Sequence, residues 1–350
     1  VSDFEHAPVN PRPLVAGVRV LDDGMRIEIV RGAGPGRPPL DLDQGWPTPL
    51  APPRPRSTAR VLELAEAQYV ATGHEDITLG APHPHDHPDL AGLVAGLRAR
   101  FRGLGLGLRI PGLPLADQVE LLDPARDPRP GPSGTSPHAQ VWPLECCPAL
   151  RRLAGLDAEN EAIVEAGRQA FRRGFASIEL CVLLGVPGES DADRVAIGAL
   201  ARALSSVAAG GSGGGGKVEL KCSLWIPRPH TACAGDAVAD PNAFAAAVQA
   251  VRNGLGRRRD VRVRADSPDG AVLDAVLGRA DRNLGAGLLA AARAGWRVRT
   301  APGRVPEGES VAARILEAAG LDPAAALGPA AAPGPWARVH LADEPPGRES

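Results

Sequence analysis

The sequence lacks the features that mark several classes of protein. It has five cysteines in 350 residues, and their spacing describes no disulfide framework, which favours a reducing compartment. No apolar run approaches the ~20 residues that span a bilayer, and residues 1–10 show no signal-peptide pattern. We therefore expect a cytoplasmic protein with no membrane association. Val1 in place of Met indicates an alternative start codon or a fragment.

The sequence also has no excess of charge of either sign. Its formal net charge is -2 and its pI is near 6.5, whereas a nucleic-acid-binding surface needs a clustered basic excess. The short basic run at residues 257–259 is typical of a solvated helix end. We expect no nucleic-acid partner, and a protein partner of unknown identity stays open.

What is present is a globular composition, with 44% hydrophobic and 23% charged residues. The length allows one large domain or two ordinary ones. The 42 glycines and 36 prolines predict long loops. Residues 123–138 are interpreted as an irregular loop, and residues 210–216 as a flexible connector without the Lys and Ser/Thr of a phosphate-binding loop.

Strand-like and helix-like patterns alternate along the chain. Strands are predicted at residues 26–30, 75–79, 105–110, 140–144, 176–184 and 217–225. Helices are predicted at residues 59–71, 89–102, 159–173, 191–208 and 242–255. Strand followed by helix favours a parallel sheet covered by helices, with the ligand-binding face at the carboxyl ends of the strands.

Several motifs stand at the ends of these strands. They are Glu-Ile-Val-Arg-Gly at 28–32, Pro-Leu-Glu at 143–145, Gly-Val-Pro-Gly-Glu-Ser at 185–190, Ile-Pro-Arg-Pro-His-Thr-Ala at 226–232, and Val-Leu-Gly-Arg-Ala-Asp-Arg-Asn-Leu-Gly at 276–285. In this order they resemble the cobalamin (B12)-binding-domain-associated family of radical S-adenosylmethionine (SAM) proteins. The segment at 226–232 carries the resemblance furthest.

The resemblance implies an α/β fold, a partial (β/α)6 TIM-type barrel with a small C-terminal α/β extension. The implied division is an extended lead-in over 1–25, a barrel over 26–258, an extension over 259–322 and a poorly ordered tail over 323–350. It also implies a [4Fe-4S] cluster and SAM as cofactors. The positions that it places on the ligand face are Glu145, Gly185, Pro187, Glu189, Pro227, Arg228 and His230.

The cysteine triad of the family is missing, however. Radical SAM proteins bind the cluster through Cys-x-x-x-Cys-x-x-Cys after the first strand, and here those positions are Ala33, Arg37 and Leu40. No oxygen or guanidinium group replaces cluster thiolates. The chain has its cysteines elsewhere, at Cys146, Cys147, Cys181, Cys222 and Cys233. We therefore expect no catalytic residue and no bound cofactor.

A histidine-rich segment offers a different chemistry. His83, His85 and His87 follow the second strand, and imidazoles, with the thiol of Cys146, are ligands that zinc accepts. The prolines between the histidines favour an extended loop that holds them apart, so no metal site is assigned. Two of the ligand-face positions have a structural alternative to ligand binding. Glu145 has the alternative of an ion pair with an arginine. Glu189 has the alternative of a carboxylate at the N-terminus of a helix, stabilised by the helix dipole.

Three hypotheses follow. The first is a degenerate radical-SAM-like protein with a non-catalytic binding or structural role. The second is a radical SAM enzyme whose cluster ligands are non-standard or come from another chain. The third is a metal-binding module that uses the loop of His83, His85 and His87.

Overall fold

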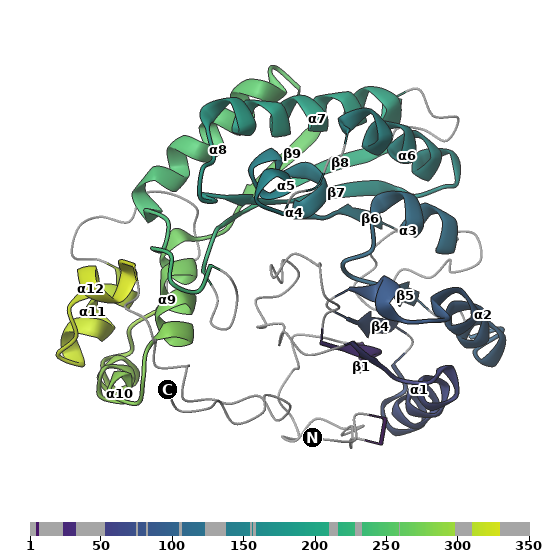
Figure 1. Ribbon diagram of the computed structural model, residues 1–350, viewed down its shortest axis with the longest axis horizontal. Helices are drawn as coiled ribbons and strands as arrows, with labels where there is room; N and C mark the ends of the chain where they lie inside the picture. The colour runs from purple at the N-terminus through teal and green to yellow at the C-terminus, as the bar shows by residue number, and fades with distance from the viewer. Residues whose placement is uncertain are drawn as a thin grey trace, which may run out of the picture.

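The computed structural model describes most of the chain. The described residues are 5–6, 24–32, 53–74, 76–81, 83–104, 107–122, 138–154, 156, 159–209, 216–227, 233–258, 260–297 and 310–329. Figure 1 shows two arcs of strands, each lined on its outside by helices, and a separate group of helices at the C-terminal end.

The first arc is a parallel sheet in the order β1-β4-β5. Its strands are β1 (Met25–Glu28), β4 (Asp76–Gly80) and β5 (Gly107–Arg109), and its helices are α1 (Thr58–Thr72) and α2 (Leu90–Arg100), with the short 3-10 helix η1 (Pro84–Asp86) after β4. Helix α1 begins where the Ser57 side chain accepts from Arg60 N. A small antiparallel pair, β2 (Val30–Arg31) and β3 (Arg54–Pro55), follows β1.

The second arc is a parallel sheet in the order β6-β7-β8-β9. Its strands are β6 (His138–Val141), β7 (Ser177–Leu184), β8 (Lys217–Leu224) and β9 (Val261–Ala265). The helices α6 (Asn160–Arg172), α7 (Asp191–Ala209) and α8 (Pro241–Leu255) cover its outer face, while α4 (Pro143–Cys146) and α5 (Pro148–Ala154) follow β6. Each strand thus meets its neighbour through a helical crossover.

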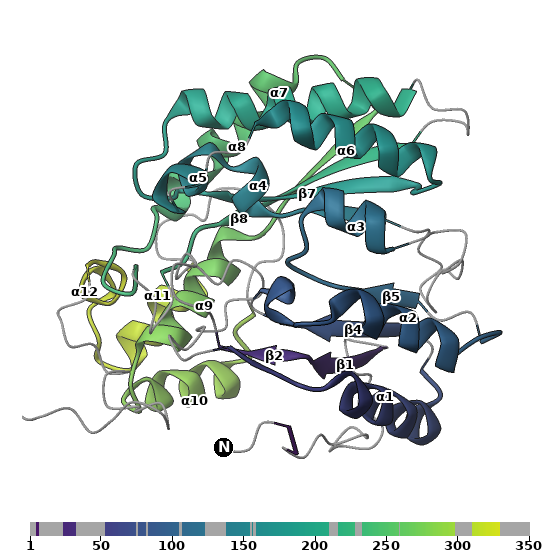
Figure 2. The same cartoon turned by 45° about the vertical axis from the view of Figure 1, so that its right-hand side comes forward.

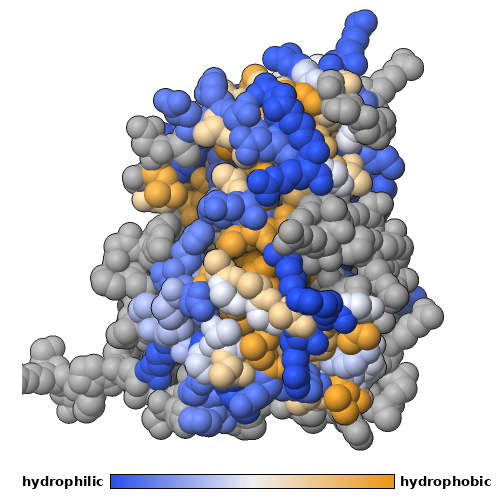
Figure 3. Space-filling view, turned by 90° about the vertical axis from the view of Figure 1, so that its right-hand side faces the viewer, coloured by the Kyte–Doolittle hydropathy of each residue, from blue (hydrophilic) through white to orange (hydrophobic). Residues whose placement is uncertain are grey.

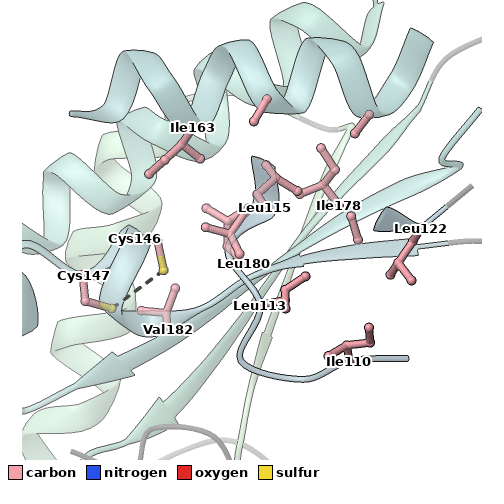
Figure 4. Packing of buried hydrophobic residues seen from close by; sticks show 14 of the residues in the cluster. Ile110, Leu113, Leu115, Leu122, Cys146, Cys147, Ile163, Ile178, Leu180 and Val182 are labelled. Carbon is pink, nitrogen blue, oxygen red and sulfur yellow. Dashed lines mark hydrogen bonds between the residues drawn. The ribbon is translucent and has the colours of Figure 1, made fainter. Parts of the chain in front are cut away.

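The alternation of side chains fixes which face of this sheet is buried. In β7, Ile178, Leu180, Val182 and Leu184 are buried, and the side chains between them are partly exposed. Figure 4 shows Ile178, Leu180 and Val182 packed beneath the helices together with Ile163. The period of two therefore places the apolar face outward under the helices and leaves a polar face toward the concave side.

Helices α7 and α8 approach each other closely because glycine stands at the crossing. A Cβ at Gly198 would collide with Val251 O, and a Cβ at Gly254 would collide with Val195 O. The two main chains are thus in contact, and the helix pair is one of the tightest elements of the fold.

The two arcs are not joined strand to strand within the described residues, because β5 and β6 share no ladder. Helix α3 (Leu115–Leu121) lies at this gap. Its buried Gln118 accepts from Gln140 N at 3.0 Å and donates to Gln140 O and Leu113 O at 2.6 Å each. One hydrophobic core nevertheless spans both arcs. In Figure 3, hydrophobic residues show in the band between the hydrophilic upper and lower parts of this side.

The C-terminal helices form a second core of their own. They are α9 (Pro268–Arg279), α10 (Leu284–Ala294), α11 (Val311–Ala318) and α12 (Pro323–Leu327), and Figure 2 shows them grouped beside the open side of the barrel. Buried Arg279 donates to Asp236 O and Gly328 O at 3.0 Å each. Those bonds join the helical group to the segment after β8.

The structure agrees with the predicted α/β partial barrel and differs from the sequence expectations in detail. A seventh parallel strand, β9, pairs with β8, so the barrel sheet continues past residue 258 into the segment expected to be the extension. Residues 143 and 144, expected to end the strand over 140–144, instead begin α4, because Pro143 has no N–H for a ladder and starts a helix well. Residue 323 begins α12 rather than a tail. The rest of that tail, and residues 210–215, lie outside the described residues.

No helix among the described residues is long and apolar enough to cross a membrane.

Candidate functional site

The carboxyl ends of the parallel strands gather at one edge of each sheet, where ligand sites of such folds lie. The loops there begin after Gly80, Arg109, Val141, Leu184 and Leu224. Most of the candidate residues predicted from the sequence lie in these loops, and the structure assigns a partner to several of them.

Glu145 joins two of these loops. Its Oε1 accepts from Leu115 N at 3.0 Å and its Oε2 accepts from Trp142 N at 3.2 Å. The residue is partly exposed, but its carboxyl group lies in the interior, and this burial raises its pKa to about 7. Its partners are main-chain amides, not the arginine that the sequence left open. Glu145 therefore ties the start of α3 to the turn after β6.

His85 extends this connection to the loop after β4. Its Nε2 lies 2.9 Å from Asp117 Oδ2 on α3, and the charge of Asp117 contributes to the raised pKa of Glu145. Loops that follow three neighbouring strands thus meet at α3. Asp117 was not predicted from the sequence, because its role depends on the position of α3 in the gap between the sheets.

His87 has both ring nitrogens bound within the protein. Asp89 N donates to Nδ1 at 3.2 Å, so Nε2 carries the proton and donates to Arg56 O at 2.9 Å. His85 is likewise engaged, with Asp117. Across the described ranges, no three His, Cys, Asp or Glu side chains are grouped so as to hold a metal ion. The geometry gives the metal-binding hypothesis, with His83, His85, His87 and Cys146, no support.

Glu189 closes the loop that follows β7. Its carboxylate accepts from Gly185 N at 2.8 Å and from Arg194 Nε at 3.0 Å. The side chain is 2% exposed, and burial raises its pKa. Gly185 has φ +86°, a conformation that favours glycine, and it lies against Ala239. Glu189 therefore shapes its own loop, and α7 begins two residues later, at Asp191.

The remaining candidates fall in different places. Pro187 is exposed at the tip of the same loop, and Pro227 is buried after β8. Arg228 and His230 lie outside the described residues. The structure therefore brings Glu145 and Glu189 to the strand ends but leaves neither carboxylate without a partner.

A comparison with known families adds a decisive observation. The family model described as the radical SAM superfamily matches residues 44–201. The chain contains a radical SAM superfamily domain. No curated protein matches the chain. Radical SAM domains in general use a [4Fe-4S] cluster and SAM. The match begins beyond residue 40, so Ala33, Arg37 and Leu40 precede it, and these three positions also lie outside the described residues.

The cysteines of this radical SAM domain do not fit a cluster. Cys146 Sγ donates to Cys181 O at 3.2 Å, and Cys147 Sγ lies 3.8 Å from Leu183 O, both thiols being buried. Figure 4 shows Cys146 and Cys147 beside Val182, on the face of the sheet that the helices cover. Burial raises the pKa of Cys146 well above its usual range, and that of Cys222 to about 12. Cluster ligands are thiolates, whereas Cys146 and Cys222 lie in the hydrophobic core, where burial favours the protonated thiol.

The concave face of the second sheet is polar, which sequence reasoning missed. Gln140 Nε2 donates to Glu179 Oε1 at 3.0 Å, and Arg264 forms an ion pair with Glu219 at 2.9 Å. Closed barrels fill this face with branched aliphatic side chains. The strict alternation in β8 and β9 was the signal that could have predicted a face open to solvent or ligand.

Proposed function

We propose that this radical SAM domain does not cleave SAM and that the protein has a binding or structural role. The observation that carries the proposal is the location of its thiols. Ala33, Arg37 and Leu40 stand at the positions where the family has its triad. Two of the chain's buried cysteines, Cys146 and Cys147, donate to main-chain carbonyls in the core. Without thiolates at the family spacing, no electron source for reductive cleavage is held by this chain.

Two further features support the same proposal. The carboxylates of Glu145 and Glu189, at positions that the family places near SAM, are both used to hold loops. The motifs at 185–190 and 226–232 favour the cobalamin-associated branch of the superfamily. All the cysteines are free, which supports a reducing compartment and hence the cytoplasm.

The test is anaerobic iron–sulfur reconstitution of the full chain, with iron counting and absorbance, beside calorimetric titration with SAM. We expect iron near background in the wild type and in a matched Cys146→Ser/Cys147→Ser variant, because neither thiol binds iron. About four irons per chain, the content of one [4Fe-4S] cluster, would overturn the proposal.

The second candidate is a radical SAM enzyme whose cluster ligands are non-standard or supplied by a partner chain. The polar concave face favours it, since a barrel that only filled space would be lined by aliphatic side chains. Purification under anaerobic conditions from the native source distinguishes the two. A co-purifying chain that brings iron with this protein would support the enzyme.

A further inference from the structure

The concave face of the second sheet carries more positive charge than the protein itself neutralises. Four cations, Lys217, Lys221, Arg262 and Arg264, project from β8 and β9 on the side away from the helices. Arg264 is paired with Glu219 at 2.9 Å. In the described part of the chain, Lys221 and Arg262 have no ion-pair or hydrogen-bond partner. This face is therefore ready to accept a negative charge.

Three carboxylates on the same face, Glu179, Glu219 and Asp266, offset part of this positive charge, but in the described part of the chain none of them forms an ion pair with Lys221. Glu179 accepts from Gln140 Nε2 at 3.0 Å and has a second contact with Cys181 Sγ at 3.7 Å. Glu219 is held by Arg264, one row along the strands from Lys221. Asp266, at the end of β9, accepts from Ser223 Oγ at 2.5 Å. Each acid is held by another group, and Lys221 is left over.

An unpaired hydrogen-bond donor lies level with Lys221 across the strands of the sheet. Trp142 Nε1 is buried and has no partner among the described residues. Trp142 is extended, with φ -80° and ψ 159°, so the alternation of β6 continues and places it on the side of Gln140. The register pairs Val141 with Leu180 and Cys181 with Lys221. Trp142 and Lys221 therefore flank Cys181, about 10 Å apart at their Cα atoms.

A second tryptophan with an unpaired indole N–H, Trp225, lies just after the carboxyl end of β8. Trp225 is 5% exposed, and its Nε1 is buried without a partner. Its N donates to Leu184 O, which continues the ladder of β8 by one residue beyond the outward-facing Leu224. A buried indole N–H without an acceptor is uncommon in proteins. Trp142 flanks the free ammonium group of Lys221, and Trp225 stands four residues further along the same strand, so a ligand on this face is the source of acceptor that we consider for the Trp142 indole.

We propose that this concave face binds an oxyanion, the carboxylate or phosphate group of a small molecule, held by the ammonium group of Lys221 and the indole N–H of Trp142. Such a group supplies negative charge and several acceptor oxygens at once, and charge-assisted bonds to it are strong. The unpaired Arg262, opposite Glu219, and the Trp225 indole, four residues beyond Lys221, lie on opposite sides of this site along the strands. This inference deepens the proposed binding role and rests on it.

The test uses the five tryptophans as reporters, since each gives one indole signal in a ¹⁵N–¹H correlation spectrum. The Trp142→Phe and Trp225→Phe variants assign two of them. The full-length protein is titrated with inorganic phosphate in one arm and with acetate in the other, at constant ionic strength with chloride. We expect the Trp142 signal to shift saturably in at least one arm. Phosphate alone indicates a phosphate ester, and acetate alone indicates a carboxylate.

Lys221→Met is the decisive variant, and Lys217→Met is its control on the same face and strand, four residues earlier. We expect Lys221→Met to weaken binding at least tenfold and Lys217→Met to bind as the wild type does. The other indole signals report whether each variant folds. No shift with either oxyanion, or equal binding by Lys221→Met, overturns the inference. Iron uptake would overturn the proposed function instead, so the two failures are distinguishable.

Discussion

The side-chain amide of Gln118 and the main chain of Gln140 form two hydrogen bonds with each other in the gap between β5 and β6, at 3.0 and 2.6 Å. A strand neighbour would bond to the same N–H and C=O groups. One glutamine thus replaces part of a missing ladder, and it bonds to Leu113 O as well. This side chain is one polar connection between the two arcs, beside the bond that Leu115 N donates to Glu145.

Gln118→Ala is therefore expected to be costly. It leaves buried main-chain groups unpaired, and we expect the free energy of unfolding to fall by about 2–4 kcal/mol. The midpoint of urea unfolding measures the change. Gln249→Ala is the control, because Gln249 is exposed and bonds only to Asn253 on its own helix. A loss below about 0.5 kcal/mol, the range of a surface substitution, would contradict the role of Gln118.

The α7–α8 crossing predicts opposite effects for two glycine substitutions. Gly198→Ala places a Cβ against Val251 O, and we expect a loss of about 1–3 kcal/mol from overpacking. Gly285, in α10, has no atom within 4 Å of an added Cβ. Gly285→Ala should stabilise the protein by roughly 0.5–1 kcal/mol, because alanine favours helix. Thermal unfolding of both variants tests the pair, and equal effects would contradict the crossing.

Glu145 predicts a dependence of stability on pH. Its folded pKa is about 7, above the ordinary value of 4.5, so the folded state binds the proton more tightly than the unfolded state. The stability that Glu145 contributes is thus present below pH 4.5 and is lost as pH rises to 7, by about 3 kcal/mol in total. Glu145→Gln should remove this slope in urea unfolding between pH 4.5 and pH 8. Glu120→Gln, on the exposed side of α3, is the matched control. The same slope in Glu145→Gln would contradict the assignment.

The buried thiols should resist alkylation. Burial raises the pKa of Cys222 to about 12 and that of Cys233 to about 11, and the thiolate is the reactive form. We expect iodoacetamide at pH 8 to leave Cys146, Cys222 and Cys233 unmodified in the native protein, as read by mass spectrometry. In urea all of them should react. Rapid native modification of Cys146 would show that the core around it is open.

Restoring the cysteine triad tests whether the missing cysteines are the reason for the proposed absence of cluster binding. Ala33→Cys, Arg37→Cys and Leu40→Cys together recreate the family spacing. We expect this variant, and not the wild type, to take up iron on reconstitution, up to about four atoms per chain. Equal iron in both proteins would show that the triad positions are not what limits cluster binding.

The parts of the fold that the sequence predicts well are those with strong local patterns. The eight-residue strands β7 and β8 carry uninterrupted alternation, and their predicted bounds differ from the observed ones by one residue or none. β9 was not predicted, although Val261 and Val263 alternate with two arginines and lie on the helix-covered face with Val218 and Leu220. The gap at β5 and the roles of Gln118 and Asp117 depend on contacts between distant segments, which no local pattern contains.

The candidate site shows the same division. Glu189 lies in a recognisable loop motif, but its bond to Gly185 N depends on how that loop folds and was not predicted. Glu145 was expected to face a ligand, yet it accepts from two main-chain amides, one of them thirty residues earlier in the chain. The unpaired indoles of Trp142 and Trp225 could not be found from sequence, since a missing partner is a property of the folded environment.

The gap between β5 and β6 divides the ladders of the barrel into blocks of three and four strands. Amide hydrogen exchange reports such blocks as separate cooperative units. We expect the amides of β4 and β5 to exchange together, with a lower opening free energy than those of β7 and β8, which lie within the larger sheet beneath α6 to α8. The barrel would then open in two stages, with the smaller arc first.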